Sequence, residues 1–326
     1  MIDRRKFLLA LPALYAASAR AQTPAGKTVR VGLFVPTTAA KYQVLEKSFV
    51  DAMRELGWIE DRNVTYDRVY GDDDMKRLPA LATALVTRGP ALIYTASNPV
   101  TLAALAKTHT IPIVFSTSND PVEFGLVKSL AHPGGNVTGV ANIGFELGGK
   151  RLQLLKQALP KIARVGVLVH PSLPESPREL KLIESAATPL GITVIPVTVK
   201  EPAGLDAGFA LLTKHRVEAL LTTHISMFLT NRKRILEFAA TRRTPVIGHR
   251  GQFADDGALM SYSSILTEQI RRAAQLADKI LKGAKPADIP VEQPPRFELV
   301  VNLKTARALA IKMPGEIMLQ ATRVIE

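Results

Sequence analysis

Short polar side chains collect directly after several predicted β-strands of this chain. The set comprises Thr37, Thr38, Ser97, Asn98, Ser118, Asp120, His224 and His249. Side chains of this kind can hold a small polar ligand by directional hydrogen bonds. Ser, Thr, Asn and Asp also cap the first turn of a helix that follows a strand, and capping is the competing role for each of them taken singly. The whole set, facing one cleft, favours ligand binding.

The sequence carries none of the common catalytic or nucleotide-binding motifs. It has no G-x-G-x-x-G after a strand, no G-x-x-x-x-G-K-[ST], no G-x-S-x-G and no H-E-x-x-H. Its histidines are dispersed without metal-ligand spacing, and it has no cysteine. The acidic run at residues 72–74 lacks the spaced carbonyl ligands of a calcium loop, which favours a solvated turn. We therefore predict no catalytic set, no metal and no cofactor.

The hydrophobic pattern indicates which elements position these side chains. Residues 29–35 form a continuous apolar run, typical of a strand buried on both faces of a parallel sheet, and helical spacing follows it. We predict strands over 29–35, 64–70, 92–95, 111–115, 137–140, 164–169, 192–199, 217–223, 245–248 and 297–301. We predict helices over 45–56, 78–85, 100–107, 178–189, 205–214, 229–241 and 265–282. This alternation specifies an α/β fold with right-handed crossovers.

The chain repeats its own pattern over a domain-sized distance. The segment at 30–36 returns at 164–171, and the Leu-Gly pair at 56–57 returns at 190–191, 134 positions later. The period is too long for a solenoid, which repeats every 20 to 50 residues or so. We therefore predict two similar doubly wound parallel-sheet lobes with a cleft between them, where ligands bind beyond the carboxyl ends of the strands.

The predicted elements after residue 264 have no counterpart in the repeated pattern, and they indicate how the lobes are joined. If helix 265–282 packs on the first half and strand 297–301 on the second, the chain crosses between lobes three times, which makes a hinge. Lobe I then comprises residues 28–143 and 264–287. Lobe II comprises residues 144–263 and 288–326.

The N-terminal residues are typical of an export signal covering positions 1–21. Arg4-Arg5-Lys6 precedes an apolar run at 7–19, and Ala19-Arg20-Ala21 has the pattern of a signal-peptidase site. The run is shorter than the roughly 20 residues that span a bilayer, which argues against a retained anchor helix. The two arginines resemble a twin-arginine signal, although Asp3 stands where Ser or Thr is usual.

The amino-acid composition limits the cellular compartments and the kinds of partner that are compatible with the chain. Without cysteine the exported protein has neither disulfides nor a lipid-modified cysteine, so we expect a soluble, monomeric periplasmic protein with no lipid anchor. Removing residues 1–21 takes away four positive charges and one negative charge, which lowers the formal net charge from +13 to +10. The remaining positive charges are scattered, the densest cluster being residues 232–234, which argues against a nucleic-acid partner.

Several segments resemble, in order, a family of ABC-transporter substrate-binding proteins with the type I periplasmic binding protein fold, the family that includes tryptophan and tyrosine transporter-linked members. The segments are Ile111–Phe115, Asn119–Val122, Gly125–Val127, Pro133–Gly139, Glu146–Leu152, Arg232–Ile235 and Phe297–Ala306. The resemblance implies a two-lobed receptor that captures a small solute and presents it to a membrane permease and its ATPase.

The resemblance also implies binding positions, and the chain departs from it at one of them. The lobe I positions are Thr37, Thr38, Ser97, Asn98, Ser118 and Asp120. Asp120 has two possible roles: it could pair with a ligand ammonium, or it could cap the helix containing Pro121 and Val122. In lobe II, Ile225 stands where many relatives carry Asp, which puts an α-amino-acid ligand in doubt. This leaves room for an aromatic, carboxylated or largely apolar solute that contacts His224 and Phe228.

Two other functions compete with the receptor hypothesis. The first is an exported two-domain α/β enzyme acting on a small polar substrate, which would use Asp120, His224 or His249. The second is the effector domain of a transcription regulator. Such regulators carry a helix-turn-helix ahead of the sensor, whereas the first predicted strand here starts at Val29 behind an export signal.

Overall fold

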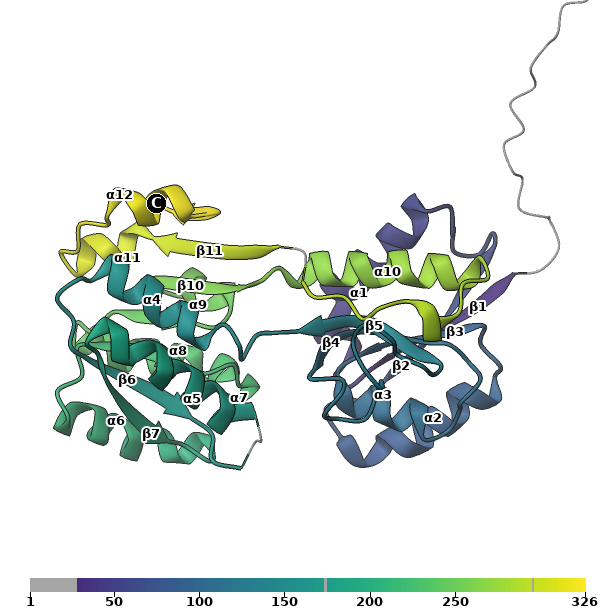
Figure 1. The fold of residues 1–326 in the computed structure, drawn as a ribbon, viewed down its shortest axis with the longest axis horizontal. Helices are drawn as coiled ribbons and strands as arrows, with labels where there is room; N and C mark the ends of the chain where they lie inside the picture. Colours follow the sequence, from purple (N-terminus) through teal and green to yellow (C-terminus); the bar gives the residue numbers. More distant parts are fainter. Residues whose placement is uncertain (1–27, 173–174, 295) are drawn as a thin grey trace, which may run out of the picture.

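The computed structural model describes residues 28–172, 175–294 and 296–326, and it has two α/β lobes that lie side by side (Figure 1). Each lobe is built around its own twisted sheet with helices on both faces. This confirms the predicted fold class. The predicted export signal at positions 1–21 lies outside the described residues.

Lobe I contains a five-stranded parallel sheet with the order β2-β1-β3-β4-β5. Its strands are β1 (Val29–Val35), β2 (Val64–Tyr70), β3 (Leu92–Ala96), β4 (Ile113–Asn119) and β5 (Val137–Asn142), and its helices from the first half of the chain are α1 (Ala39–Glu55), α2 (Leu78–Thr87) and α3 (Asn98–Leu105). A short 3-10 turn, η1 (Met75–Arg77), precedes α2. The inner strand β1 is apolar on both faces because helices cover both sides of it.

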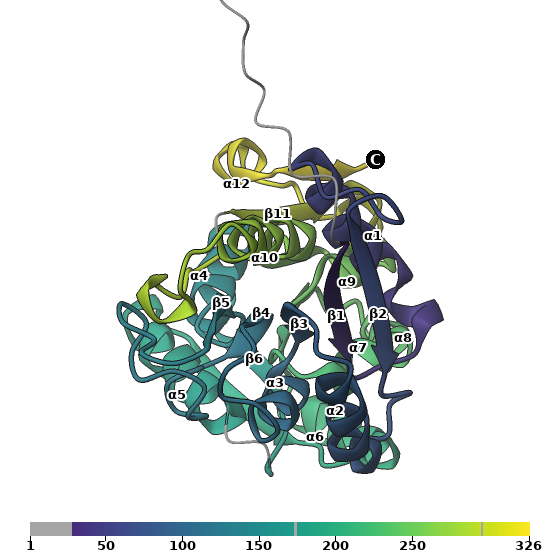
Figure 2. The same cartoon turned by 90° about the vertical axis from the view of Figure 1, so that its right-hand side faces the viewer.

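Helices pack on the two faces of this sheet in separate layers (Figure 2). On one face Phe49 and Met53 of α1 share a core with residues of α10 (Leu266–Leu281), a helix that the chain adds only after it has built most of lobe II. On the other face Phe34 of β1 packs with Leu85 of α2 and with Val100 of α3. Lobe I is therefore complete only when the late helix α10 is in place.

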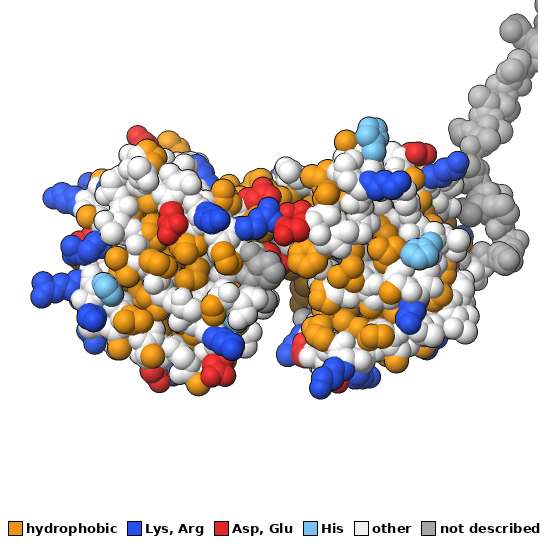
Figure 3. Space-filling model, turned by 60° about the horizontal axis from the view of Figure 1, so that its bottom comes forward, with side chains coloured by type: hydrophobic (Ala, Val, Ile, Leu, Met, Phe, Trp, Pro, Cys, Tyr) orange, Lys and Arg blue, Asp and Glu red, His pale blue; other side chains and the backbone are white. Residues whose placement is uncertain are grey.

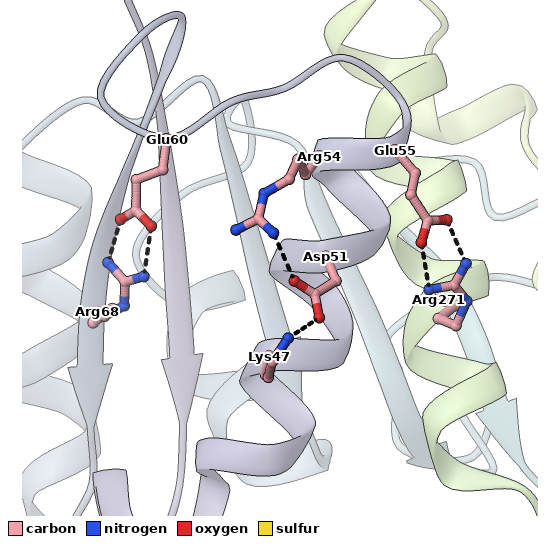
Figure 4. A network of polar contacts seen from close by, with 7 residues as sticks. All are labelled: Lys47, Asp51, Arg54, Glu55, Glu60, Arg68 and Arg271. Carbon is pink, nitrogen blue, oxygen red and sulfur yellow. Dashed lines mark hydrogen bonds and ion pairs between the residues drawn. The ribbon is translucent and has the colours of Figure 1, made fainter.

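Polar contacts on the same face also connect α10 to the N-terminal part of lobe I. The indole nitrogen of Trp58 donates a hydrogen bond to Asp278 in α10 over 2.9 Å, and both side chains are buried. On the surface, Glu55 at the end of α1 forms a bidentate ion pair with Arg271 of α10 (Figure 4). Exposed pairs of this kind contribute about 0.2 to 1 kcal/mol, so the apolar core carries most of the attachment.

Lobe II contains a seven-stranded sheet with the order β12-β11-β10-β9-β8-β6-β7. Its strands are β6 (Arg164–Val169), β7 (Thr193–Thr198), β8 (Ala219–Thr222), β9 (Val246–Gly248), β10 (Met260–Ser264), β11 (Phe297–Asn302) and β12 (Arg323–Ile325). Its helices are α4 (Gly148–Ala158), α5 (Glu175–Ala187), α6 (Leu205–Lys214), α7 (Ser226–Thr230), α8 (Arg232–Thr241), α9 (Gly251–Asp255), α11 (Leu303–Ala308) and α12 (Gly315–Gln320). Three further 3-10 turns are η2 (Thr188–Leu190), η3 (Pro202–Gly204) and η4 (Pro286–Asp288), the last of which lies beside β5 of lobe I.

Two features of lobe II differ from the sequence expectation. The helix predicted over 229–241 is two helices, α7 and α8, separated at Asn231, whose side-chain amide donates to the backbone carbonyl of Met227. Strand β11 runs antiparallel to β10 in an otherwise parallel sheet. It must do so because β10 leads out of lobe II into α10, and the chain then returns from lobe I in the opposite direction.

Three crossovers join the lobes: from β5 to α4, from β10 to α10, and from η4 to β11 (Figure 1). The carboxyl ends of β5 and β10 lead straight into two of these crossovers. Since neighbouring strands run parallel to them, the carboxyl edges of the two sheets face each other across the gap between the lobes. The polar strand-end residues predicted from the sequence lie at these edges.

Candidate ligand site between the lobes

A cavity of 460 Å³ lies beside the crossovers and is lined by residues of both lobes. From lobe I, Val44 and Leu45 of α1 and Leu266 of α10 supply an apolar wall. From lobe II, the wall is polar and comprises His224, Ser226, His249, Arg250, Gln252, Asp255, Ser263, Ser264, Glu298 and Arg323. The volume suits a small molecule. A notch separates the two lobes on the molecular face in Figure 3.

Two of the sequence-predicted residues, His224 and His249, lie in this wall with their rings edge to face, 5.3 Å between centroids. His249 is buried, and its Nδ1 lies 3.0 Å from the hydroxyl of Thr222 at the end of β8. The ring of His224 packs on Gly144 of the first crossover, where an added Cβ would lie 2.4 Å from the ring. Only glycine fits at this position, so the crossover and the cavity wall are in direct contact.

A buried arginine connects the crossovers to the same wall. Arg151 of α4 is fully buried and donates hydrogen bonds to the carbonyls of Gly144 (2.7 Å) and Tyr262 (2.9 Å) and to Glu179 (2.8 Å). The other carboxylate oxygen of Glu179 accepts the backbone N–H of His224 over 2.7 Å. One guanidinium thereby fixes the first crossover, strand β10 and the loop that carries His224.

Burial sets the charge state of this region. It lowers the pKa values of both His224 and His249 well below the ordinary value of 6.5, and the charge of Arg151 lowers them further, so both rings are neutral at pH 7. Burial also raises the pKa of Glu179 and lowers that of Arg151, while their ion pair opposes both shifts. The two histidines can therefore act as neutral hydrogen-bonding groups toward a ligand.

Several cavity residues were missed by the sequence analysis, above all Arg250, Ser263 and Ser264. Arg250 directly follows His249 at the end of β9, so its strand-end position was visible in the sequence. The two serines end β10, a strand that the sequence pattern did not indicate, because it is short and alternates small and polar residues.

Four of the predicted lobe I residues lie at the carboxyl ends of β1 and β3, outside the wall of this cavity: Thr37, Thr38, Ser97 and Asn98. The hydroxyl of Thr38 caps α1 by accepting the N–H of Lys41. The ammonium of Lys41 and, to a smaller extent, the side chain of Thr37 hydrogen-bond Asp73 and lower the pKa of that carboxyl group. Asn98 is buried and donates to the carbonyl of Asn119 over 2.8 Å. The hydroxyl of Ser97 is buried without a hydrogen-bond partner among the described residues, and its φ of 140° is rare for a residue with a side chain.

Asp120 is engaged in both capping and an ion pair. One carboxylate oxygen accepts the backbone N–H of Glu123 over 3.1 Å, as a cap does, but residues 121–125 form a turn and not the expected helix. The other accepts a hydrogen bond over 2.7 Å from Arg178 of α5, which belongs to the opposite lobe. These contacts lower the pKa of Asp120 against the effect of its partial burial. The carboxylate that could bind a ligand ammonium is thus occupied by a cation from lobe II.

The two remaining predicted residues have other surroundings. Phe228 of α7 is fully buried in the lobe II core with Ile225, Phe253 and Leu168, outside the cavity wall. Ser118 lies in β4, where the backbone register to β5 shifts between Ser116 and Ser118. Ile225, at the position where many relatives carry Asp, is itself buried in that core.

The sequence profile of the family described as ABC transporter substrate binding protein matches residues 29–325, nearly the whole chain. The chain belongs to this family. A tyrosine-binding protein from Clostridioides difficile (strain R20291) is 26% identical to this family member over 288 residues, which cover 88% of this chain and 83% of that protein.

Solved structures agree with the fold of this substrate-binding protein. An ABC domain in complex with L-Trp from Streptococcus pneumoniae is 23% identical with a TM-score of 0.80, and the match covers 92% of this chain and 100% of that one. A ligand-free, open substrate binding protein with adhesive properties from Clostridium difficile is 24% identical with a TM-score of 0.76, covering 91% and 99%.

Membership in the family implies that the protein binds a small molecule, that its partners are a membrane permease and its ATPase, and that it is located outside the cytoplasm. In the described part of the chain, no helix has the length and apolar character needed to cross a membrane. The described residues also hold no cluster of three or more His, Asp or Glu side chains that could bind a metal ion. The small-molecule ligand, the permease and ATPase partners and the extracytoplasmic location that the family implies match the receptor hypothesis drawn from the sequence.

Proposed function

We propose that this protein is the periplasmic receptor of an ABC importer and captures a small aromatic or carboxylated solute in the cavity between its lobes. It works as a soluble monomer and delivers the solute to the permease. The observation that carries this proposal is the 460 Å³ cavity, with an apolar wall from one lobe and a polar wall from the other. A solute that contacts both walls stabilises the closed arrangement of the lobes relative to the open one.

Two features support an aromatic solute. A relative is named a tyrosine-binding protein, and a protein of the same fold was solved with L-Trp. In the cavity, Val44, Leu45 and Leu266 offer an apolar surface against which a ring can pack.

Lobe closure is the test of this function. Native mass spectrometry of freshly purified mature protein identifies any solute that copurifies, and small-angle X-ray scattering then compares the stripped protein with the protein saturated with that solute. L-tyrosine and L-tryptophan serve as further probes. We expect a smaller radius of gyration in the saturated protein. A solute that saturates the protein and leaves the scattering curve unchanged would contradict the proposal.

The competing enzyme hypothesis has a separate test. We expect that a solute recovered after long incubation with the protein is chemically unaltered, because the receptor only binds and releases it. Mass spectrometry of the recovered solute checks this. Conversion of the solute by the wild-type protein, absent in a His249→Gln variant, would favour the enzyme instead.

A further inference from the structure

One arginine in the cavity wall has no anionic partner. Arg250 lines the cavity, and its guanidinium forms no hydrogen bond or ion pair with any residue that the structure describes. By contrast, Arg323 in the same wall pairs with Asp255 (2.6 Å) and with Glu298 (2.9 Å). Arg151 nearby pairs with Glu179. Both acidic side chains of the cavity wall are therefore engaged by Arg323, and neither of them contacts the guanidinium of Arg250.

The surroundings of Arg250 make this unpaired charge costly. Burial and the nearby charge of Arg151 lower the pKa of the Arg250 guanidinium to about 10, and the two neighbouring histidines are neutral. Arg250 still carries its proton at pH 7. A partly desolvated guanidinium without a counter-ion destabilises the empty protein, and an anion from outside would remove that penalty.

The opposite wall defines the rest of the ligand. Val44 is 72% exposed although it is a large aliphatic residue, and it lines the cavity with Leu45 and Leu266. An exposed apolar surface facing a wall with one unpaired guanidinium is complementary to a molecule with an anionic end and an apolar body. The wall has no unpaired carboxylate to receive an ammonium, and Asp120 is occupied by Arg178.

We propose that Arg250 binds the carboxylate of the solute, and that the solute is an aromatic monocarboxylate without an α-amino group, its ring packed against Val44 and Leu45. The proposal rests on the proposed receptor function and narrows its substrate class. Arg250 presents a planar fork of N–H donors that matches a carboxylate. The serines at the end of β10 and the neutral histidines supply further hydrogen-bonding groups in the same wall.

Two series of probe molecules test the carboxylate and the ammonium group of a ligand separately, because the aromatic ring is the same within each series. The first is 3-phenylpropionate, L-phenylalanine and 2-phenylethylamine; the second is indole-3-propionate, L-tryptophan and tryptamine. Isothermal titration calorimetry on stripped mature protein measures their affinities. We expect at least one of the two acids to bind most tightly in its series, the amino acids about tenfold or more weakly, and the amines not at all.

A pair of variants assigns the effect to Arg250. We expect Arg250→Gln to weaken binding of the acid by about 10- to 100-fold. The matched control is Arg307→Gln, which removes an exposed arginine of α11 in the same lobe and should bind like the wild type. Thermal unfolding of the ligand-free proteins separates binding from folding. We expect Arg250→Gln to unfold at the same temperature as the wild type or higher, since no hydrogen bond or ion pair of the guanidinium with a described residue is lost and the uncompensated charge is removed.

Four results would overturn the proposal: failure of both acids to bind, an amino acid or amine that binds as tightly as its acid, unchanged acid affinity in Arg250→Gln, or a lower unfolding temperature of that variant. Small-angle X-ray scattering distinguishes failure of the proposed substrate class from failure of the proposed receptor function. Lobe closure by a solute without a carboxylate refutes the substrate class alone. Binding of an acid through Arg250 without closure refutes the receptor function alone.

Discussion

His249 shows how a single buried side chain couples stability to pH. Its ordinary pKa is 6.5, and burial lowers the pKa well below that value in the folded protein. As the pH falls through 6.5, the unfolded chain binds a proton that the folded protein does not bind, so the free energy of unfolding decreases. The loss is about 1.4 kcal/mol per pH unit for one histidine, once the pH is below 6.5.

A His249→Gln variant isolates this effect. Glutamine can keep a hydrogen bond to Thr222 but does not titrate. Between pH 7 and pH 5 we expect the variant to lose about 2 kcal/mol less of its free energy of unfolding than the wild type. Urea unfolding at the two pH values measures this difference directly. Equal losses in the two proteins would mean that the folded protein protonates His249 as readily as the unfolded chain does.

For single residues, the sequence predicted which side chains lie near the cavity better than it predicted the partners of those side chains. His224 and His249 lie in the cavity wall as the strand-end pattern suggested. The engagement of Asp120 by Arg178 could not be predicted, because the partner lies 58 positions away in the opposite lobe. Nor could burial of Phe228, since an apolar residue after a strand is equally compatible with core and cavity.

Among the elements, helix α4 depends on one buried ion pair. Arg151 and Glu179 are 0% and 1% exposed, and removal of the arginine alone leaves a buried carboxylate without its counter-ion. We expect Arg151→Met to lower the free energy of unfolding by about 3 to 5 kcal/mol. The double variant Arg151→Met, Glu179→Gln should recover at least about 1 kcal/mol, because the amide can still accept the N–H of His224 without a charge. Urea unfolding of the wild type, the two single variants and the double variant measures the coupling free energy between Arg151 and Glu179.

The matched control is the exposed pair of Arg271 and Glu55 (Figure 4). The same substitutions there, Arg271→Met and Glu55→Gln, should each change the free energy of unfolding by less than about 1 kcal/mol. If the exposed and the buried pair have equal effects, Arg151 does not anchor the crossovers as described.

The elements themselves were largely predictable. Of the helices that were not predicted, α4 has 11 residues and the others are short. Strands β1, β2 and β6 have the predicted bounds because each is a single run between turns. The short helices α9, α11 and α12 were not predicted, since five or six residues are too few to show helical periodicity. Tertiary contacts stabilise them instead: Phe253, Ala306 and Ile317 are buried in the lobe II core.

For the whole molecule, Arg178 is the side chain that connects the lobes away from the crossovers. It pairs with Asp120 and Glu123 of lobe I and stacks over Phe145, 5.2 Å from the ring centre. Arg178 is 45% exposed, so these pairs contribute about 0.2 to 1 kcal/mol each and are weakened by salt. We expect Arg178→Gln to widen the range of interlobe distances in the ligand-free protein.

The absence of native cysteine makes this measurable with two introduced labels. Spin labels at Lys107→Cys in lobe I and Lys214→Cys in lobe II, both exposed positions, report the distance distribution by pulsed electron resonance. High salt should broaden the wild-type distribution toward that of the Arg178→Gln variant. The control Arg242→Gln, which removes an exposed arginine stacked on Phe238, should leave the width unchanged. A narrow distribution in the variant at every salt concentration would contradict a restraining role for Arg178.

The placement of α10 has a consequence for how the protein is made. All five strands of lobe I are synthesised by Asn142, yet the apolar face of α1 stays uncovered until residues 266–281 have left the ribosome. At ordinary translation rates that interval is on the order of ten seconds or more. Most of lobe II is also synthesised in this interval, but its strands β11 and β12 follow α10, so neither lobe is complete until the last part of the chain has been made. A cell that exports this protein therefore handles an incomplete N-terminal lobe for most of its synthesis, and premature termination before α10 yields a sheet with one face covered by α1 alone.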